Sequence, residues 1–78
     1  MKSDEALERL TVLIRHHIDE PDTPITAKSN LQDDLGMDSL KQVDLVIEIE
    51  REFGIVVDDS EIVQWRDLGT IINSIVSR

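Results

Sequence analysis

The stretch that decides the fold is residues 34–40, which read Asp-Leu-Gly-Met-Asp-Ser-Leu. Gly36 permits a tight turn, and Ser39 then stands at the start of a predicted helix over residues 39–53. The positive end of a helix favours an anion, such as a phosphodiester on the hydroxyl of Ser39, with Asp38 beside it. Residues 39–42, Ser-Leu-Lys-Gln, also form a capping box, and spacing alone favours this simpler role for the serine.

The predicted helix over residues 39–53 has two apolar faces. The first face is predicted to join the core, and its members are Leu45, Val46, Ile49 and Phe53. The second lies roughly opposite and carries Leu40, Val43 and Ile47. Asp44 and Glu50 lie at its margins. Because a surface helix needs only one apolar face, a later helix covers the second face, or it is a docking strip for other proteins, or both hold in part.

The remaining helices are predicted around this one. Residues 3–18 form the first helix, with an apolar stripe that Val12 and Leu13 widen and with Ser3 or Asp4 as its cap. A short helix covers residues 61–64 after a cap at Asp58, Asp59 or Ser60. Trp65 is predicted to pack in the core. Asp67 caps the last helix, whose core stripe comprises Leu68, Ile71, Ile72, Ile75 and Val76.

The long connection over residues 19–38 needs a structural reason. Pro21 and Pro24 are predicted to stop the first helix, and Ile25, Leu31 and Leu35 to anchor the loop. Residues 29–32, Ser-Asn-Leu-Gln, suggest one capped helical turn. A loop running the length of the bundle would leave the first two long helices nearly parallel. The predicted fold is therefore all-α, a four-helix bundle of three longer helices and one short helix, with a long loop between helices one and two.

The composition of the chain limits the classes of function that it can have. The chain has 78 residues, which fit one domain over residues 1–78, and it has no cysteine, so any thiol chemistry must come from an added group. A net charge of −9 disfavours nucleic acid and anionic membranes and favours partners with basic patches. Without an apolar signal core or spanning segment, we expect a cytoplasmic protein, a monomer that does not insert into membranes.

Catalysis by the chain itself is not expected. Ser39 lacks the flanking glycines of a nucleophile elbow, and no glycine-rich phosphate loop is present. His16 and His17 are neighbours that point in different directions, so they are interpreted as solvated residues at a helix end. Adjacent acids suit solvation or capping, and no metal-binding spacing is present. No catalytic residue and no metal ligand is predicted.

A family resemblance changes the interpretation of Ser39. Residues 34–40, followed by Val-Asp-Leu-Val at residues 43–46 and Glu-Arg-Glu-Phe-Gly at residues 50–54, resemble the acyl carrier proteins of fatty-acid and polyketide synthesis. The resemblance implies 4′-phosphopantetheine esterified to Ser39 by a phosphopantetheinyl transferase. The thiol of this arm would hold acyl intermediates as thioesters, and the cargo can fold back between the helices.

The resemblance also assigns residues. Ser39 matches the attachment serine and Asp38 the acid before it. The residues that match positions recognised by acyl-loading and acyl-processing enzymes are Leu40, Val43, Asp44, Ile47 and Glu50. Lys41 and Arg51 depart from the pattern of fatty-acid carriers, so a specialised lipid pathway with its own complementary partners stands beside fatty-acid and polyketide synthesis as an alternative. Trp65 is similar to a feature of D-alanyl carrier proteins, so an aminoacyl carrier is one alternative, and a non-carrier interaction module is another.

Overall fold

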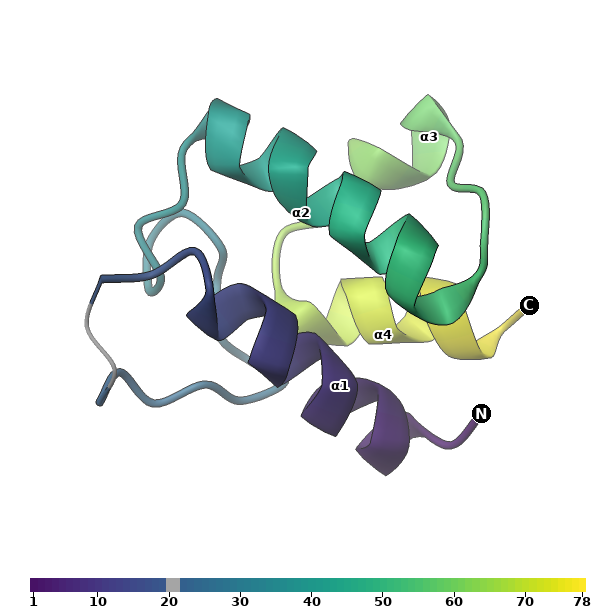
Figure 1. Cartoon of the computed structure of the whole chain (residues 1–78), viewed down its shortest axis with the longest axis horizontal. Helices are drawn as coiled ribbons and strands as arrows, with labels where there is room; N and C mark the ends of the chain where they lie inside the picture. Colours follow the sequence, from purple (N-terminus) through teal and green to yellow (C-terminus); the bar gives the residue numbers. More distant parts are fainter. Residues whose placement is uncertain (20–21) are drawn as a thin grey trace.

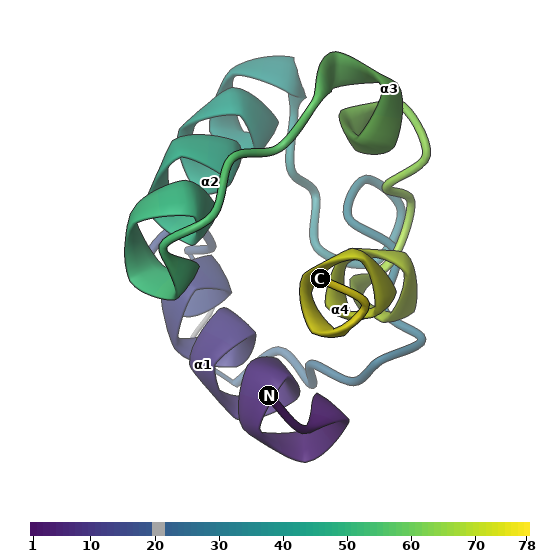
Figure 2. The same cartoon turned by 90° about the vertical axis from the view of Figure 1, so that its right-hand side faces the viewer.

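The computed structural model describes residues 1–19 and 22–78, and in these residues the regular structure is helical. The helices are α1 (Ser3–Arg15), α2 (Ser39–Phe53), α3 (Asp59–Ile62) and α4 (Leu68–Val76). α1 packs against both α2 and α4 (Figure 1). α3 lies between α2 and α4, on the side of the molecule away from α1 (Figure 2). The predicted bundle of three longer helices, one short helix and a long first loop is confirmed.

The direction of the first two helices was predicted wrongly. α1 and α2 run in opposite directions, and α4 runs with α2 (Figure 1). Two contacts fix this order: Arg9 in α1 forms an ion pair with Glu52 at 2.8 Å, and His17 beyond α1 contacts Glu48. Moving forward from Arg9 to His17 therefore means moving backward along α2. The described part of the long loop, residues 22–38, crosses the molecule and returns to the side on which α1 ends, so it does not make the helices parallel (Figure 1).

The core is aliphatic and comes from three helices and the loops between them. α1 contributes Ala6, Leu10 and Ile14, and α2 contributes Leu45 and Ile49. α4 contributes Leu68, Ile71, Ile72 and Ile75. The connecting segments add Leu31, Leu35, Met37, Val57 and Trp65. The core stripes predicted for α2 and α4 are confirmed, but Val12 is exposed and does not widen the stripe of α1.

The ends of α1 differ from the expectation. Lys2 is its N-cap residue and makes no side-chain capping bond, so the cap predicted at Ser3 or Asp4 is wrong. The helix ends at Arg15, before the predicted stop. Pro24 therefore lies well beyond the helix end, and Pro21 is outside the described residues. The apolar spacing in the sequence continues past the end of the helix, because Ile18 still packs against the core.

The first loop is tied to the start of α4. Its Leu31 N–H donates to the Arg66 carbonyl at 2.9 Å, and the Gly69 N–H donates to the Ala27 carbonyl at 2.8 Å. Leu31 and Leu35 are buried and Ile25 is partly buried, so the predicted anchors are confirmed. The predicted capped helical turn is instead a hydrogen-bonded turn.

The side chain that organises this turn is Asn30. Its Oδ1 accepts from the N–H groups of Gln32 and Asp33, both at 2.9 Å. Ser29 is buried, and its Oγ accepts from the Thr26 N–H at 2.9 Å. The predicted capping role of Ser29 is therefore wrong, because the serine closes the preceding turn.

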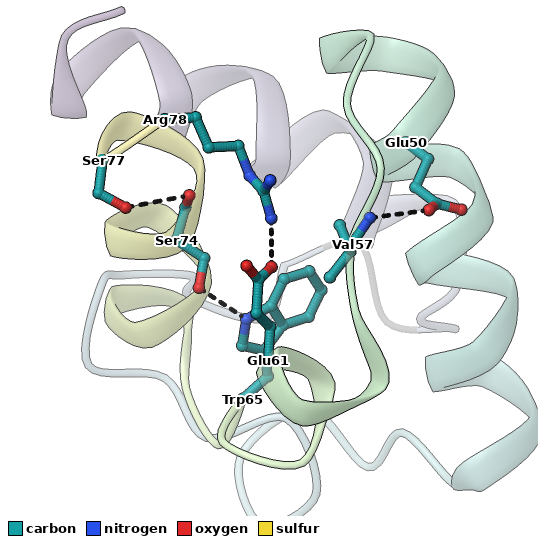
Figure 3. Close-up of polar contacts among 7 residues, drawn as sticks. All are labelled: Glu50, Val57, Glu61, Trp65, Ser74, Ser77 and Arg78. Carbon is teal, nitrogen blue, oxygen red and sulfur yellow. Dashed lines mark hydrogen bonds and ion pairs between the residues drawn. The ribbon is translucent and has the colours of Figure 1, made fainter.

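Polar contacts attach α3 to its surroundings (Figure 3). Asp58 is its N-cap residue and makes no side-chain capping bond, and the helix begins two residues before the predicted start. Trp65 is buried, as predicted, and its Nε1 donates to Ser74 Oγ at 3.0 Å. Arg78 pairs with Glu61. In the segment before α3, Val57 is buried, but Val56 is 79% exposed.

Candidate functional site

The start of α2 presents Ser39 outward. Asp38, not Ser39, is the N-cap residue, and its Oδ1 accepts from the Lys41 N–H at 2.9 Å. Gln42 does not complete a capping box, because its Nε2 donates to the Met37 carbonyl at 3.2 Å. The predicted capping box over residues 39–42 is therefore wrong. Ser39 is exposed, and its hydroxyl has no hydrogen-bond partner in the described part of the chain.

Buried neighbours hold this exposed position in place. Met37 is 1% exposed, and its N–H donates to the Leu31 carbonyl at 2.9 Å. Gly36 has a φ of 63°, a left-handed conformation that glycine adopts at little cost, as the sequence predicted. Sequence reasoning missed Met37, although an apolar residue directly before a helix cap is a recognised signal. The outward turn at residues 38–39 is thus fixed by the inward side chain before it.

This geometry suits a phosphodiester on the Ser39 oxygen. The hydroxyl is at the first helical position, where the backbone N–H groups and the helix dipole favour an anion. Asp38 already performs the capping, so modification of Ser39 breaks no hydrogen bond of the described structure. The exposed position also leaves room for a modifying enzyme. The residues present therefore fit a covalently attached phosphate group at Ser39.

The second apolar face of α2 is largely exposed. Leu40 is 78% exposed, Val43 57% and Ile47 44%, so α3, which borders Val43 and Ile47, covers this face only in part. Asp44 is exposed beside it. Glu50 is partly buried, and its Oε2 accepts from the Val57 N–H at 3.0 Å (Figure 3). Glu50 therefore also holds the segment that follows α2, a structural role that the sequence did not indicate.

An apolar groove of about 310 Å³ lies between α2 and α3. The residues that line it are Gln42, Val43, Val46, Ile47, Asp59 and Ile62. Gln42 is three residues after Ser39, and residues at this spacing are neighbours on one helix surface. The groove therefore begins within about one helical turn of the exposed hydroxyl.

The histidines are placed differently from each other. His16 is exposed, as expected. His17 is not solvated, because its Nε2 lies 2.7 Å from Glu48 Oε2 and its side chain is only 14% exposed. The two partners are 31 residues apart, and no local pattern signals the contact. The expectation of a solvated residue at this position is wrong.

Among residues 1–19 and 22–78, none of the helices combines the length and the hydropathy that spanning a bilayer requires. The same residues contain no group of three or more His, Cys, Asp or Glu side chains placed to hold a metal ion.

Comparison with known proteins gives consistent matches. Residues 8–75 match the family model described as a phosphopantetheine attachment site. An acyl carrier protein of Thermotoga maritima is 35% identical over 72 residues, which cover 92% of this chain and 89% of the relative. An acyl carrier protein of Phenylobacterium zucineum is 34% identical over 74 residues, which cover 95% and 94%.

Solved structures agree with these matches. The acyl carrier protein of Enterococcus faecalis superposes with a TM-score of 0.78 at 32% identity, over 99% of this chain and 98% of that one. A candidate acyl carrier protein of Mycobacterium tuberculosis gives a TM-score of 0.84 at 32% identity, over 92% and 96%.

Proposed function

The chain belongs to the phosphopantetheine-binding family of acyl carrier proteins, and from this membership we propose that Ser39 is the residue that bears the prosthetic arm. Proteins of this family carry 4′-phosphopantetheine covalently. The observation that carries the assignment is the exposed, unbonded hydroxyl of Ser39 at the first position of α2. Asp38 supports it by capping the helix, which leaves the serine available for a transferase.

The function that this geometry supports best is transport of acyl groups. When attached, the arm supplies a terminal thiol that holds an acyl group as a thioester, in fatty-acid, polyketide or specialised lipid synthesis. The chain itself contributes a rigid anchor at Ser39 and performs no catalysis. We propose that residues 1–78 act as a single carrier domain, as a monomer in the cytoplasm.

The attachment is tested by intact mass after incubation with a phosphopantetheinyl transferase and coenzyme A. The wild-type chain should gain one phosphopantetheine, and Ser39→Ala should gain none. Ser60→Ala is the matched control, because Ser60 is also an exposed serine near a helix start, and it should be modified normally. An unmodified wild type, or modified Ser39→Ala, would refute the assignment.

The cargo class is tested by loading enzymes. Transfer of acyl groups onto the arm by acyl-processing enzymes supports an acyl carrier. Charging by an amino-acid adenylating ligase, with no charging by acyl-transferring enzymes, would contradict it and favour the aminoacyl alternative.

The largely exposed second face of α2 supports a docking surface for these enzymes. Leu40, Val43 and Ile47 offer an exposed apolar centre. Asp44 and Glu50 add negative charge that complements a basic patch and favours fast, salt-dependent association. Weak contacts of this kind suit a carrier that must exchange among several enzymes.

Charge reversal tests the docking surface. Asp44→Lys should weaken binding to a partner enzyme and reduce its dependence on salt, while Asp4→Lys, an exposed acid on α1, should leave both unchanged. Glu50→Lys is less informative, because it also removes the bond to Val57. Equal binding by Asp44→Lys and wild type would show that α2 is not the docking surface.

A further inference from the structure

A second cleft lies next to the attachment site and adjoins the groove between α2 and α3. It has a volume of about 460 Å³ and lies between the first loop and the segment that joins α3 to α4. Gln42 and Ile62 line both this cleft and the α2–α3 groove. Because Gln42 is one helical turn from Ser39, a flexible arm on the serine has access to both spaces.

The walls of this cleft are held by backbone pairing and by the core. Leu31 and Trp65 line it and are 3% and 7% exposed. The Leu31 N–H donates to the Arg66 carbonyl at 2.9 Å, which joins the two walls. Trp65 is fixed by its bond to Ser74 (Figure 3). The cleft is thus built from rigid parts, and its volume falls within the usual range for small-molecule sites, roughly 300–1,000 Å³.

The polar groups of the cleft distinguish it from the apolar groove. The residues with polar or charged side chains among those that line it are Asn30, Gln32, Asp33, Gln42 and Arg66. Asn30 Oδ1 and the Gln42 Nε2 already have partners within the chain. The groove between α2 and α3, by contrast, is lined largely by aliphatic side chains. An alkyl chain is suited to the groove, and a polar chain end is suited to the cleft.

Arg66 supplies the charge that selects among polar chain ends. Its guanidinium has no hydrogen-bond or ion-pair partner among the described residues, whereas Arg9 and Arg78 are both ion-paired. A guanidinium matches the geometry of a carboxylate through paired N–H donors. Asp33 opposes an anion there. It also lines the neighbouring hollow that contains Lys41, so it lies on the ridge between the two spaces.

We propose that this cleft binds the free carboxylate of an acyl group carried on the Ser39 arm, with Arg66 as the cation. The ligand class is a half-thioester of a short dicarboxylic acid. This inference rests on the proposed function, because the arm at Ser39 delivers the ligand. Exposure of Arg66 to solvent limits the strength of the pair, which suits a cargo that must leave again for the next enzyme.

The test compares two cargoes of equal length. A phosphopantetheinyl transferase loads the chain from glutaryl-coenzyme A or from pentanoyl-coenzyme A, and intact mass verifies each product. These cargoes differ only in a terminal carboxylate or methyl group. Two-dimensional NMR should show shifts at Gln32, Trp65 Nε1–H and Arg66 in the glutaryl form, and not in the pentanoyl form. Equal shifts for both cargoes, or glutaryl shifts confined to Val43 and Ile47, would overturn the proposal.

Charge variants separate binding from a general change of structure. In the glutaryl form, Arg66→Gln should abolish the shifts at Gln32 and Trp65, and Asp33→Asn should increase them. Arg51→Gln, an exposed arginine of α2 that does not line the cleft, should leave them unchanged. Equal shifts in Arg66→Gln and wild type would contradict the role of Arg66. Failure to load would refute the attachment at Ser39, whereas normal loading without the shifts would refute only the carboxylate site.

Discussion

The starts of α2 and α4 have the same kind of aspartate cap, but the first helical residue is exposed in α2 and buried in α4. Asp38 and Asp67 each accept a hydrogen bond at 2.9 Å from the N–H three residues later. At α4 the cap is reciprocated by Thr70, and the first helical residue, Leu68, is completely buried. At α2 the cap is not reciprocated, and the first helical residue, Ser39, is exposed.

This difference shows that the same aspartate cap can precede a core residue in one helix and an exposed residue in another. An aspartate cap fixes where a helix begins without deciding what the next residue does. At α4 the next residue joins the core and the first loop pairs with the backbone around it. At α2 the next residue is left for attachment of the arm. Substitutions should therefore lower the free energy of unfolding strongly at the start of α4 and only slightly at the start of α2.

The largest expected effect comes from a matched pair of leucines. Leu68→Ala should lower the free energy of unfolding by about 2–5 kcal/mol, because it leaves a cavity at a fully buried position. Leu40→Ala should change it by less than about 0.5 kcal/mol, because Leu40 is 78% exposed. Urea denaturation measures both values. Similar losses for the two variants would contradict the predicted difference between the two helix starts.

Removal of the two caps should give a smaller difference in the free energy of unfolding than the two leucine variants. Asp67→Ala should cost about 1–2 kcal/mol, because it dismantles a reciprocal capping box in a partly buried setting. Asp38→Ala should cost about 0.5–1 kcal/mol, because this cap is exposed and acts alone. The same denaturation experiment applies, with Asp58→Ala as the control, since Asp58 makes no side-chain capping bond. A larger loss for Asp38→Ala would contradict this ranking.

The smallest expected effect is at the attachment position. Ser39→Ala should change the free energy of unfolding by less than about 0.5 kcal/mol, because its hydroxyl has no partner in the described structure. Ser29→Ala provides the contrast and should cost about 1–3 kcal/mol, because its buried Oγ accepts from the Thr26 N–H. A loss of about 1 kcal/mol or more in Ser39→Ala would indicate a capping role after all.

Much of the fold was readable from local patterns. The bounds of α2 and the cap at Asp67 follow from periodicity and residue preference, and both are confirmed. The exposed face of α2 was also visible as an apolar stripe that the core did not need. These features depend on residues close together in the chain, and such signals survive in a single sequence.

The features that were missed depend on contacts between distant residues. The pairing of His17 with Glu48, the antiparallel order of α1 and α2, and the bond from Val57 to Glu50 have no local signature. At the site, Asp38 and Ser39 are both acceptable caps by preference, and only the observed hydrogen bond separates them. The sequence thus identified Ser39 as an important residue. Only the structure shows that its hydroxyl takes no part in capping the helix.

The most direct test of the central claim is to locate the added group by fragmentation mass spectrometry of the modified wild-type chain. The account predicts one phosphopantetheine on Ser39 and none on the other serines, which are Ser3, Ser29, Ser60, Ser74 and Ser77. The group found on any other residue, or a chain that stays unmodified at Ser39, would contradict it.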